Sequence, residues 1–327
     1  MEDLLFTINA ILPILIPVFV GYFLRRIKFM SDEFWGKCNK LVFNLFLPIL
    51  LFSNLYTASL SNIDFKFVGF SAAAILVLFF IGMLLVLLIP NRKQKGVMLQ
   101  ASFRSNYAII GIPLAMMLGG DGAKASASVV AAATVPLFNI LAVIALTIYD
   151  HEDGSKVSVK NILKKIITNP LIIGVIAGLL FNFMSMGIDN LGGNVEAFLG
   201  EATFITKTIS NLAGVATPLA LVVLGARFEF KAVKALWKQL TLSVSVRLVV
   251  TPLVFLTIAY FLGFKSPTEF AILIALFATP IAVSSAPMAA QMGQDEELAG
   301  QIVVWTSALS AFTLFIIIFI CSSIGIF

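Results

Sequence analysis

Long apolar runs recur along the whole chain and constrain its fold more than any other feature. Each run is about twenty residues long, as in Leu4–Leu24 and Ile166–Met186, and a helix of that length crosses a hydrocarbon layer of ~30 Å. Apolar residues make up 60% of the 327 residues and charged residues only 12%, whereas soluble domains average about 45–50% and about 25%. The chain is therefore predicted to be an all-α polytopic membrane protein.

Hydropathy predicts ten membrane spans. They run approximately over Leu4–Leu24, Phe34–Tyr56, Phe67–Ile89, Val97–Leu118, Ala125–Tyr149, Ile166–Met186, Thr203–Ala226, Leu236–Gly263, Thr268–Met292 and Ala299–Ile326. The polar stretch Gly187–Ala202, between the sixth and seventh spans, is interpreted as an extramembrane linker.

The basic residues are distributed unequally between the two sides of the predicted bundle. Sixteen lie in one set of loops and four in the other, while Arg104 and Arg247 fall within spans. Because cytoplasmic loops carry an excess of Lys and Arg, the first set is placed in the cytoplasm and both termini outside, in a plasma membrane of the bacterial inner-membrane type. These loops also explain the net charge of +5, so nucleic-acid binding is not expected.

The chain contains a weak internal repeat. Residues Pro13–Leu24 align with Pro170–Phe181 at four identities in twelve positions, although both segments are low in complexity. Residues Ile112–Ala125 align with Ala286–Ala299 at five identities in fourteen, including Pro, Gly and Asp. Span 1 thus matches span 6, and span 4 matches span 9. Because each repeat holds five spans, an odd number, the repeats have opposite orientations in the membrane, as in many secondary transporters.

Spans 4 and 9 contain helix-breaking residues near the middle of the membrane. Span 4 reads SNYAIIGIPL and span 9 reads TPIAVSSAPM, which aligns Asn106 with Pro280 and Pro113 with Pro287. Proline removes a helical hydrogen bond, and the freed backbone groups cannot face lipid. The two broken helices are therefore expected to cross and form a substrate site, where half-helix N-termini favour an anion. The alternative is that these prolines only kink the helices.

The candidate substrate-binding residues come mainly from these interruptions. The charge of Arg104 is neutralised by an anionic ligand, or else its side chain snorkels to the cytoplasmic interface. For Arg247, the alternative to a role in ligand binding is a structural one, in which it binds backbone carbonyls freed by the breaks. Ser284 and Ser285 are candidates for contacting the substrate or a sodium ion. The predicted set is Arg104, Ser105, Asn106, Tyr107, Pro113, Pro280, Ser284, Ser285, Pro287 and Asn44. Other polar residues in spans, which either line a path or bond between helices, are Asn54, Asn139 and Gln291.

Five segments, in order along the chain, resemble the auxin efflux carrier family. They are NKLVFNLFLPIL, SNYAIIGIPL, NPLIIGVIAGL, VRLVVTPLV and TPIAVSSAPMA, in spans 2, 4, 6, 8 and 9. That family includes bacterial organic-acid permeases and plant auxin exporters. The chain differs from the plant exporters at Ser105, where they carry a proline, and in a short central loop of about 20 residues, Asp150–Asn169. The first difference weakens the expectation that auxin itself is the substrate.

The resemblance implies a ten-span fold of two inverted repeats, similar to bile-acid sodium symporters and sodium/proton antiporters. The repeats are predicted at residues 1–149 and 169–327, joined by a cytoplasmic linker at 150–168. The resemblance also implies a scaffold domain of spans 1, 2, 6 and 7 and a moving transport domain of spans 3–5 and 8–10. It further implies a homodimer formed through the scaffold and a carboxylate bound near Asn106.

The predicted function is elevator-type secondary transport of a small organic anion, either a malate-like dicarboxylate or an auxin-like monocarboxylate. The alternatives are a passive anion channel and a sodium-coupled symporter of a larger amphipathic acid. Coupling to sodium or to protons stays open, although no carboxylate falls at a span centre to carry protons. An enzyme is not expected, because the sequence has no nucleophile elbow, no His-Glu-x-x-His pair and no midplane pair of aspartates. Neither a cofactor nor a metal site is expected.

Overall fold

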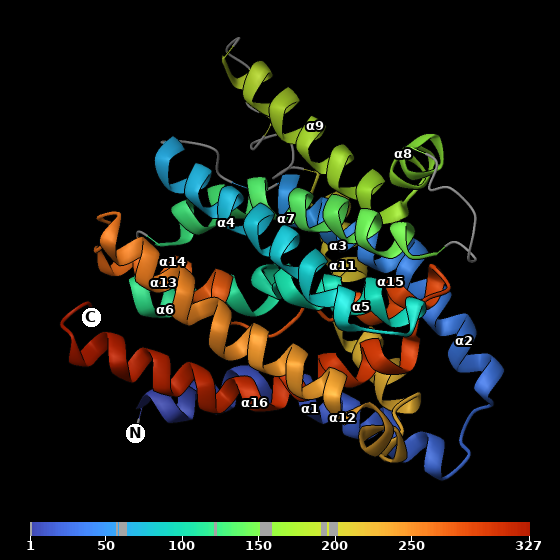
Figure 1. Cartoon of the computed structure of the whole chain (residues 1–327). Helices are drawn as coiled ribbons and strands as arrows, with labels where there is room; N and C mark the ends of the chain where they lie inside the picture. Colours follow the sequence, from blue (N-terminus) through green and yellow to red (C-terminus); the bar gives the residue numbers. More distant parts are fainter. Residues whose placement is uncertain are drawn as a thin grey trace.

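The computed structural model describes residues 2–56, 58, 64–120, 123–150, 159–190, 195 and 202–327, with the backbone alone at 2–11, 159, 161, 189 and 190. All regular elements within these ranges are helices, which confirms the predicted all-α class. Most of the long helices run roughly along one common axis, which we take as the axis of the bundle (Figure 1).

Seven helical segments of the described chain are long and apolar enough to cross a membrane. They are α2–η1–α3 (Asp32–Leu41, Val42–Phe46 and Leu47–Tyr56), α4–η2 (Phe65–Leu85 and Val86–Leu88), α7 (Ala123–Ile148), α9 (Pro170–Asn190), α11 (Thr203–Ala226), α12–η4–α13 (Phe230–Ser245, Val246–Val250 and Thr251–Phe261) and α16 (Glu296–Ser323). These segments coincide with predicted spans 2, 3, 5, 6, 7, 8 and 10, and α1 (Glu2–Arg26) covers predicted span 1.

Predicted spans 4 and 9 are both interrupted, as the sequence indicates. Span 4 consists of α5 (Arg92–Phe103), η3 (Tyr107–Gly111) and α6 (Ile112–Gly119), and span 9 consists of α14 (Pro267–Phe277) and α15 (Ser285–Gln291). In span 4 the non-helical residues are 104–106, so the break precedes the Gly-Ile-Pro sequence that predicted it. Pro113 instead lies in the first turn of α6.

Three prolines follow π-helical turns. The turns η1, η3 and η4 each end two residues before a proline, namely Pro48, Pro113 and Pro252. A proline lacks the backbone N–H, and its ring clashes with the carbonyl four residues earlier. A wider π turn before the proline accommodates both effects within a helix. The helix therefore continues through each of these prolines, and the true breaks lie elsewhere.

Predicted spans 1, 2, 6 and 7 pack on one another through close crossings. Helix α1 lies against α11, and α3 lies against both α9 and α11. A Cβ atom at Gly21 would lie 1.9 Å from the Val222 carbonyl oxygen, and one at Gly178 would lie 2.9 Å from the Phe52 carbonyl oxygen. Only glycine allows backbones to approach this closely. Gly21 and Gly178 occupy equivalent positions in the sequence repeat.

The remaining helices form a second packed group that contains both interrupted spans. Helix α5 packs against α4 and α7, while α6 packs against α7 and α14. Helix α16 packs against α12 and α15 within this group, and also against α1 of the first group. The two interrupted spans meet inside this group, because α14 contacts both η3 and α6.

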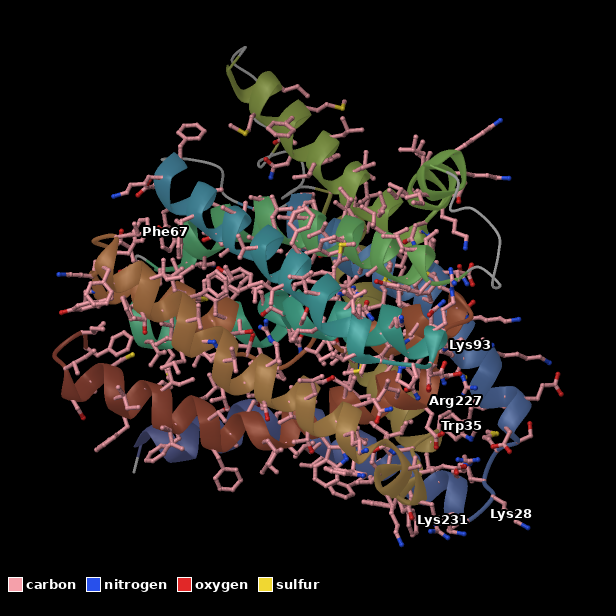
Figure 2. The ribbon with its side chains drawn as sticks, viewed as in Figure 1. Lys28, Trp35, Phe67, Lys93, Arg227 and Lys231 are labelled. Carbon is pink, nitrogen blue, oxygen red and sulfur yellow. The ribbon has the colours of Figure 1, made fainter. Side chains whose placement is uncertain are left out.

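The two ends of the bundle differ in charge. Figure 2 shows Lys28, Lys93, Arg227 and Lys231 at one end, which we call the basic end, and Phe67 at the other. Both ends of the chain lie away from the basic end (Figure 1). Helix α8 (Val159–Ile167), within the predicted central linker, packs against α7 and α9. The rest of that linker at 151–158, and most of the predicted linker after span 6, lie outside the described residues.

Candidate functional site

The two interruptions meet through a backbone hydrogen bond. The N–H of Asn106 donates to the carbonyl oxygen of Pro280 over 2.9 Å. Beside this bond, the hydroxyl oxygens of Ser105 and Thr279 lie 2.7 Å apart. Each pair is separated by 174 residues, which is also the offset of the sequence repeat between spans 4 and 9. Equivalent positions of the two repeat segments therefore touch each other at this crossing.

Arg104 is buried at the crossing among uncharged groups. Its guanidinium donates to Gln100 Oε1 over 2.5 Å and to Asn139 Oδ1 over 3.0 Å. It also donates to Ser284 Oγ over 2.8 Å and lies 3.1 Å from Met288 Sδ. With only 2% of its surface exposed, Arg104 does not snorkel to an interface as one alternative proposed. None of its four partners carries a charge, so a net positive charge is held inside the protein.

Two side-chain amides fix the orientation of this guanidinium. Asn139, on α7, donates from Nδ2 to the Val135 carbonyl over 2.9 Å, which leaves Oδ1 to accept from Arg104. Gln100, on α5, donates from Nε2 to the Ser285 carbonyl over 3.4 Å, which leaves Oε1 to accept. Gln100 was absent from the predicted site, although a glutamine within an apolar span is a signal that could have found it.

A cavity of ≈ 50 Å³ lies between the crossing and α3, and we call it the crossing cavity. Its lining residues are Leu47, Leu50, Leu51, Asn54, Arg104, Ser105, Asn106, Ala108, Ile109, Val135, Phe138, Asn139, Ala282 and Ser284. Asn106 is 2% exposed, and within the described residues its Nδ2 atom has no hydrogen-bond acceptor. A buried donor without an acceptor costs about 1–3 kcal/mol. The lining thus combines a buried cation with an unsatisfied amide donor, which is the chemistry that an anionic oxygen requires.

Arg247 stabilises the second break and does not line the crossing cavity. Its Nε atom donates to the Thr279 carbonyl and its Nη2 atom to the Leu276 carbonyl, each over 2.9 Å. These carbonyls lie at the end of α14, where the helix no longer supplies partners. The structural alternative that the sequence offered for Arg247 is confirmed.

Three predicted site residues lie away from the crossing cavity. Tyr107 is buried, but its hydroxyl donates to the Ala127 carbonyl over 3.1 Å. Pro113 is exposed on α6. Asn44 is exposed on η1, and its Nδ2 atom donates to the Lys40 carbonyl over 2.8 Å. Hydropathy identifies a span but does not tell which face of it points to the crossing.

The remaining predicted residues belong to the second break. Pro280 contributes its carbonyl to the crossing, while Ser285 and Pro287 are buried in α15. Ser284 accepts a hydrogen bond from Arg104, so a sodium ion at Ser284 would lie beside a guanidinium that repels it. Helix α15 has only seven residues, which leaves it a small dipole with which to attract an anion.

A larger cavity of ≈ 490 Å³ lies at the basic end, between α1, α2 and α11 on one side and α15 and α16 on the other. Ion pairs border it. Arg25 lies 3.3 Å from both Asp32 and Glu229, and Arg227 pairs with Glu296. The cavity also contacts Ala286 and Pro287 of α15, so it extends from the basic end toward the second break.

A family model and one relative match nearly the whole chain, and a second relative matches about two thirds of it. The sequence model of the family described as membrane transport protein matches residues 6–318, a range that includes both interrupted spans. An uncharacterised transporter from Methanothermobacter thermautotrophicus is 24% identical over 312 residues, which cover 94% of this chain and 95% of the relative. An uncharacterised transporter from Methanocaldococcus jannaschii is 24% identical over 232 residues, which cover 69% of this chain and 70% of that protein.

Proposed function

The chain belongs to the membrane transport protein family, also known as the auxin efflux carriers, and on this premise we propose that it carries a small organic carboxylate across the membrane. One observation carries the proposal: the crossing cavity holds a buried cation, Arg104, whose partners are all uncharged, together with an amide of Asn106 that lacks an acceptor. A carboxylate would neutralise the first and satisfy the second.

The hydrogen bonds of the site favour an anion over a cation. The oxygens of Asn139, Gln100 and Ser284 already accept from Arg104. Both Nη atoms of Arg104 are engaged in these bonds, so the group left without a partner among the described residues is a donor, the Asn106 amide, beside the positive charge of the guanidinium. Carboxylate oxygens accept from such donors through charge-assisted hydrogen bonds, which are roughly twice as strong as neutral ones.

The proposal includes ten spans arranged as two inverted repeats. The ten spans are the seven continuous segments described above, helix α1 and the two interrupted spans. Two observations support the inversion. Equivalent residues touch at the crossing, as Asn106 and Pro280 do, and residues related by a two-fold axis can meet only near that axis. Equivalent glycines, Gly21 and Gly178, also lie at equivalent helix crossings. The basic end then faces the cytoplasm of the plasma membrane, with both termini outside.

An elevator-type movement is the mechanism that we propose. Spans 1, 2, 6 and 7 would form the scaffold, and the group that contains both breaks would move. The crossing cavity lies at the boundary between them, because α3 belongs to the scaffold and the other lining residues belong to the moving group. Sliding of that group along α3 would carry a bound carboxylate from one side of the membrane to the other.

Ligand-induced thermal stabilisation of the purified protein tests the proposal. A ligand that binds the folded state at a hundredfold its Kd raises stability by about 2.7 kcal/mol. A panel of mono- and dicarboxylates, each with and without sodium, is expected to contain at least one acid that raises the Tm of the wild type and not of Asn106→Ala. Equal shifts in the variant would move the site away from the crossing, and no shift with any acid would contradict a carboxylate substrate.

Transport into proteoliposomes separates a carrier from the channel alternative. A carrier binds its substrate at a site that alternates between the two sides, so its flux saturates with substrate concentration. We expect saturable uptake of the acid that stabilises the protein. Ohmic currents that rise linearly with voltage and do not saturate would favour the channel.

A further inference from the structure

We infer that the crossing cavity selects for a single negative charge, so that its substrate is a short monocarboxylate with an apolar body and dicarboxylates are excluded. This inference rests on the proposed function and narrows its substrate class. Four features of the described residues carry it: the charge of the lining, the apolar α3 side, the position of Arg247 and the acidic character of the larger cavity.

The charge of the lining matches one carboxylate. Arg104 is the one charged side chain among the described residues that line the crossing cavity. Its four partners are uncharged, and Asn106 adds one neutral donor. A bound monocarboxylate would therefore leave the cavity electrically neutral. A dicarboxylate would leave an unpaired negative charge inside the protein, where desolvation strongly disfavours it.

The α3 side of the cavity suits hydrocarbon. Leu47, Leu50 and Leu51 line this side, and Ile109 and Phe138 add further apolar surface. The one polar side chain that α3 places in the lining is Asn54, which is uncharged. A ligand whose carboxylate binds Arg104 would thus place its carbon chain against leucines. The small cavity volume, ≈ 50 Å³, favours a short chain.

The other arginine within a span cannot supply a second positive contact. Arg247 donates to the Thr279 and Leu276 carbonyls and does not line the crossing cavity. The residue is 1% exposed within the packed interior. Its Nη1 atom has no acceptor within the described residues, but it is enclosed by this packing away from the crossing cavity. Arg104 therefore remains the single positive charge at the crossing cavity among the described residues.

The larger cavity at the basic end also opposes a dianion. Despite the basic loops around it, its acidic lining residues outnumber its arginines: they are Asp32, Glu229, Asp295, Glu296 and Glu297, against Arg25 and Arg227. Both arginines are already paired with carboxylates of this set. An anion inside this cavity thus meets a lining with more carboxylates than arginines, and the repulsion from those carboxylates doubles for two charges.

Matched acids of equal chain length test the inference on the wild-type protein. Butyrate and succinate both have four carbons and differ in one carboxylate. Binding is measured by thermal shift and by calorimetry on the detergent-purified chain at constant ionic strength. We expect butyrate to bind and succinate to bind at least a hundredfold more weakly, since a buried carboxylate without a positive partner is strongly disfavoured.

Two further measurements avoid dependence on a single variant. Lowering the pH through the second ionisation of succinate makes it a monoanion, so its apparent affinity relative to butyrate is expected to rise. Asn54→Lys adds a cation to the α3 side and is expected to admit succinate, whereas the matched control Asn54→Gln adds none and should keep the wild-type preference.

A succinate affinity that is equal to or greater than that of butyrate in the wild type would overturn the inference and leave carboxylate transport standing. Failure of butyrate, succinate and the wider acid panel to bind would overturn the proposed function itself.

Discussion

The backbone N–H of Asn106 donates to the carbonyl of Pro280 over 2.9 Å and joins two helix breaks that lie 174 residues apart in the chain. The donor is the N-cap residue of η3, and the acceptor belongs to the non-helical segment between α14 and α15. The bond therefore pairs one backbone group from each break, and backbone groups outside helices need such partners at membrane depth. The side chains beside it, Arg104 and Asn106, are thereby placed in one cavity.

Arg104→Gln is expected to abolish carboxylate binding, because it removes the single charge of the crossing cavity. The loss should be at least a hundredfold in Kd, about 2.7 kcal/mol. Arg104→Lys retains the charge but cannot reproduce contacts with Gln100, Asn139 and Ser284 at once, so we expect an intermediate affinity. Titration of butyrate by calorimetry checks both variants. Unchanged affinity in Arg104→Gln would remove Arg104 from the site.

Asn139→Asp provides a charge-neutralising test. The new carboxylate would lie at the position of an oxygen now 3.0 Å from the guanidinium, so it would pair with Arg104 and compete with any anionic ligand. We expect carboxylate binding to be lost while the Tm of the unliganded protein does not fall. Asn139→Ala removes the acceptor without adding charge and should weaken binding by only about tenfold. Equal behaviour of the two variants would contradict a role for the net charge of Arg104.

Arg247→Leu is expected to lower the Tm, because it leaves the Leu276 and Thr279 carbonyls without their buried donors. The loss of stability should be about 1–3 kcal/mol for each unsatisfied group. Arg247→Lys can reach one carbonyl and should recover part of the loss. Thermal unfolding followed by tryptophan fluorescence gives the comparison. A Tm equal to that of the wild type would mean that the end of α14 does not depend on these bonds.

Gly21→Ala is expected to destabilise the crossing of α1 and α11, since its Cβ would lie 1.9 Å from the Val222 carbonyl oxygen. The backbones must separate, which typically costs about 1–3 kcal/mol. Gly69→Ala on α4 is the matched control, because nothing lies within 4 Å of its added Cβ, and its Tm should stay the same or rise slightly. Similar Tm values for the two variants would show that the crossing adjusts freely.

Much of the architecture could be read from the amino-acid order. Apolar runs predicted the helices because a helix that faces lipid must be apolar along its length. The pairing of SNYAIIGIPL with TPIAVSSAPM predicted that spans 4 and 9 are interrupted, and both are. The location of the break was less accurate: Pro113 is accommodated by the π turn η3, and the chain leaves the helix at residues 104–106 instead.

The roles of individual polar side chains depended on three-dimensional packing. In the sequence, Arg104, Tyr107 and Asn44 are all polar residues within apolar spans. In the structure, Arg104 lines the crossing cavity, Tyr107 donates a hydrogen bond to α7 and Asn44 is exposed. The partners of Arg104 come from α5, α7 and α15 or its preceding turn. A hydrogen bond depends on distances of a few tenths of an ångström between elements far apart in sequence. Local composition carries no such distances, so only the folded chain decides which polar groups satisfy one another and which remain available to a ligand.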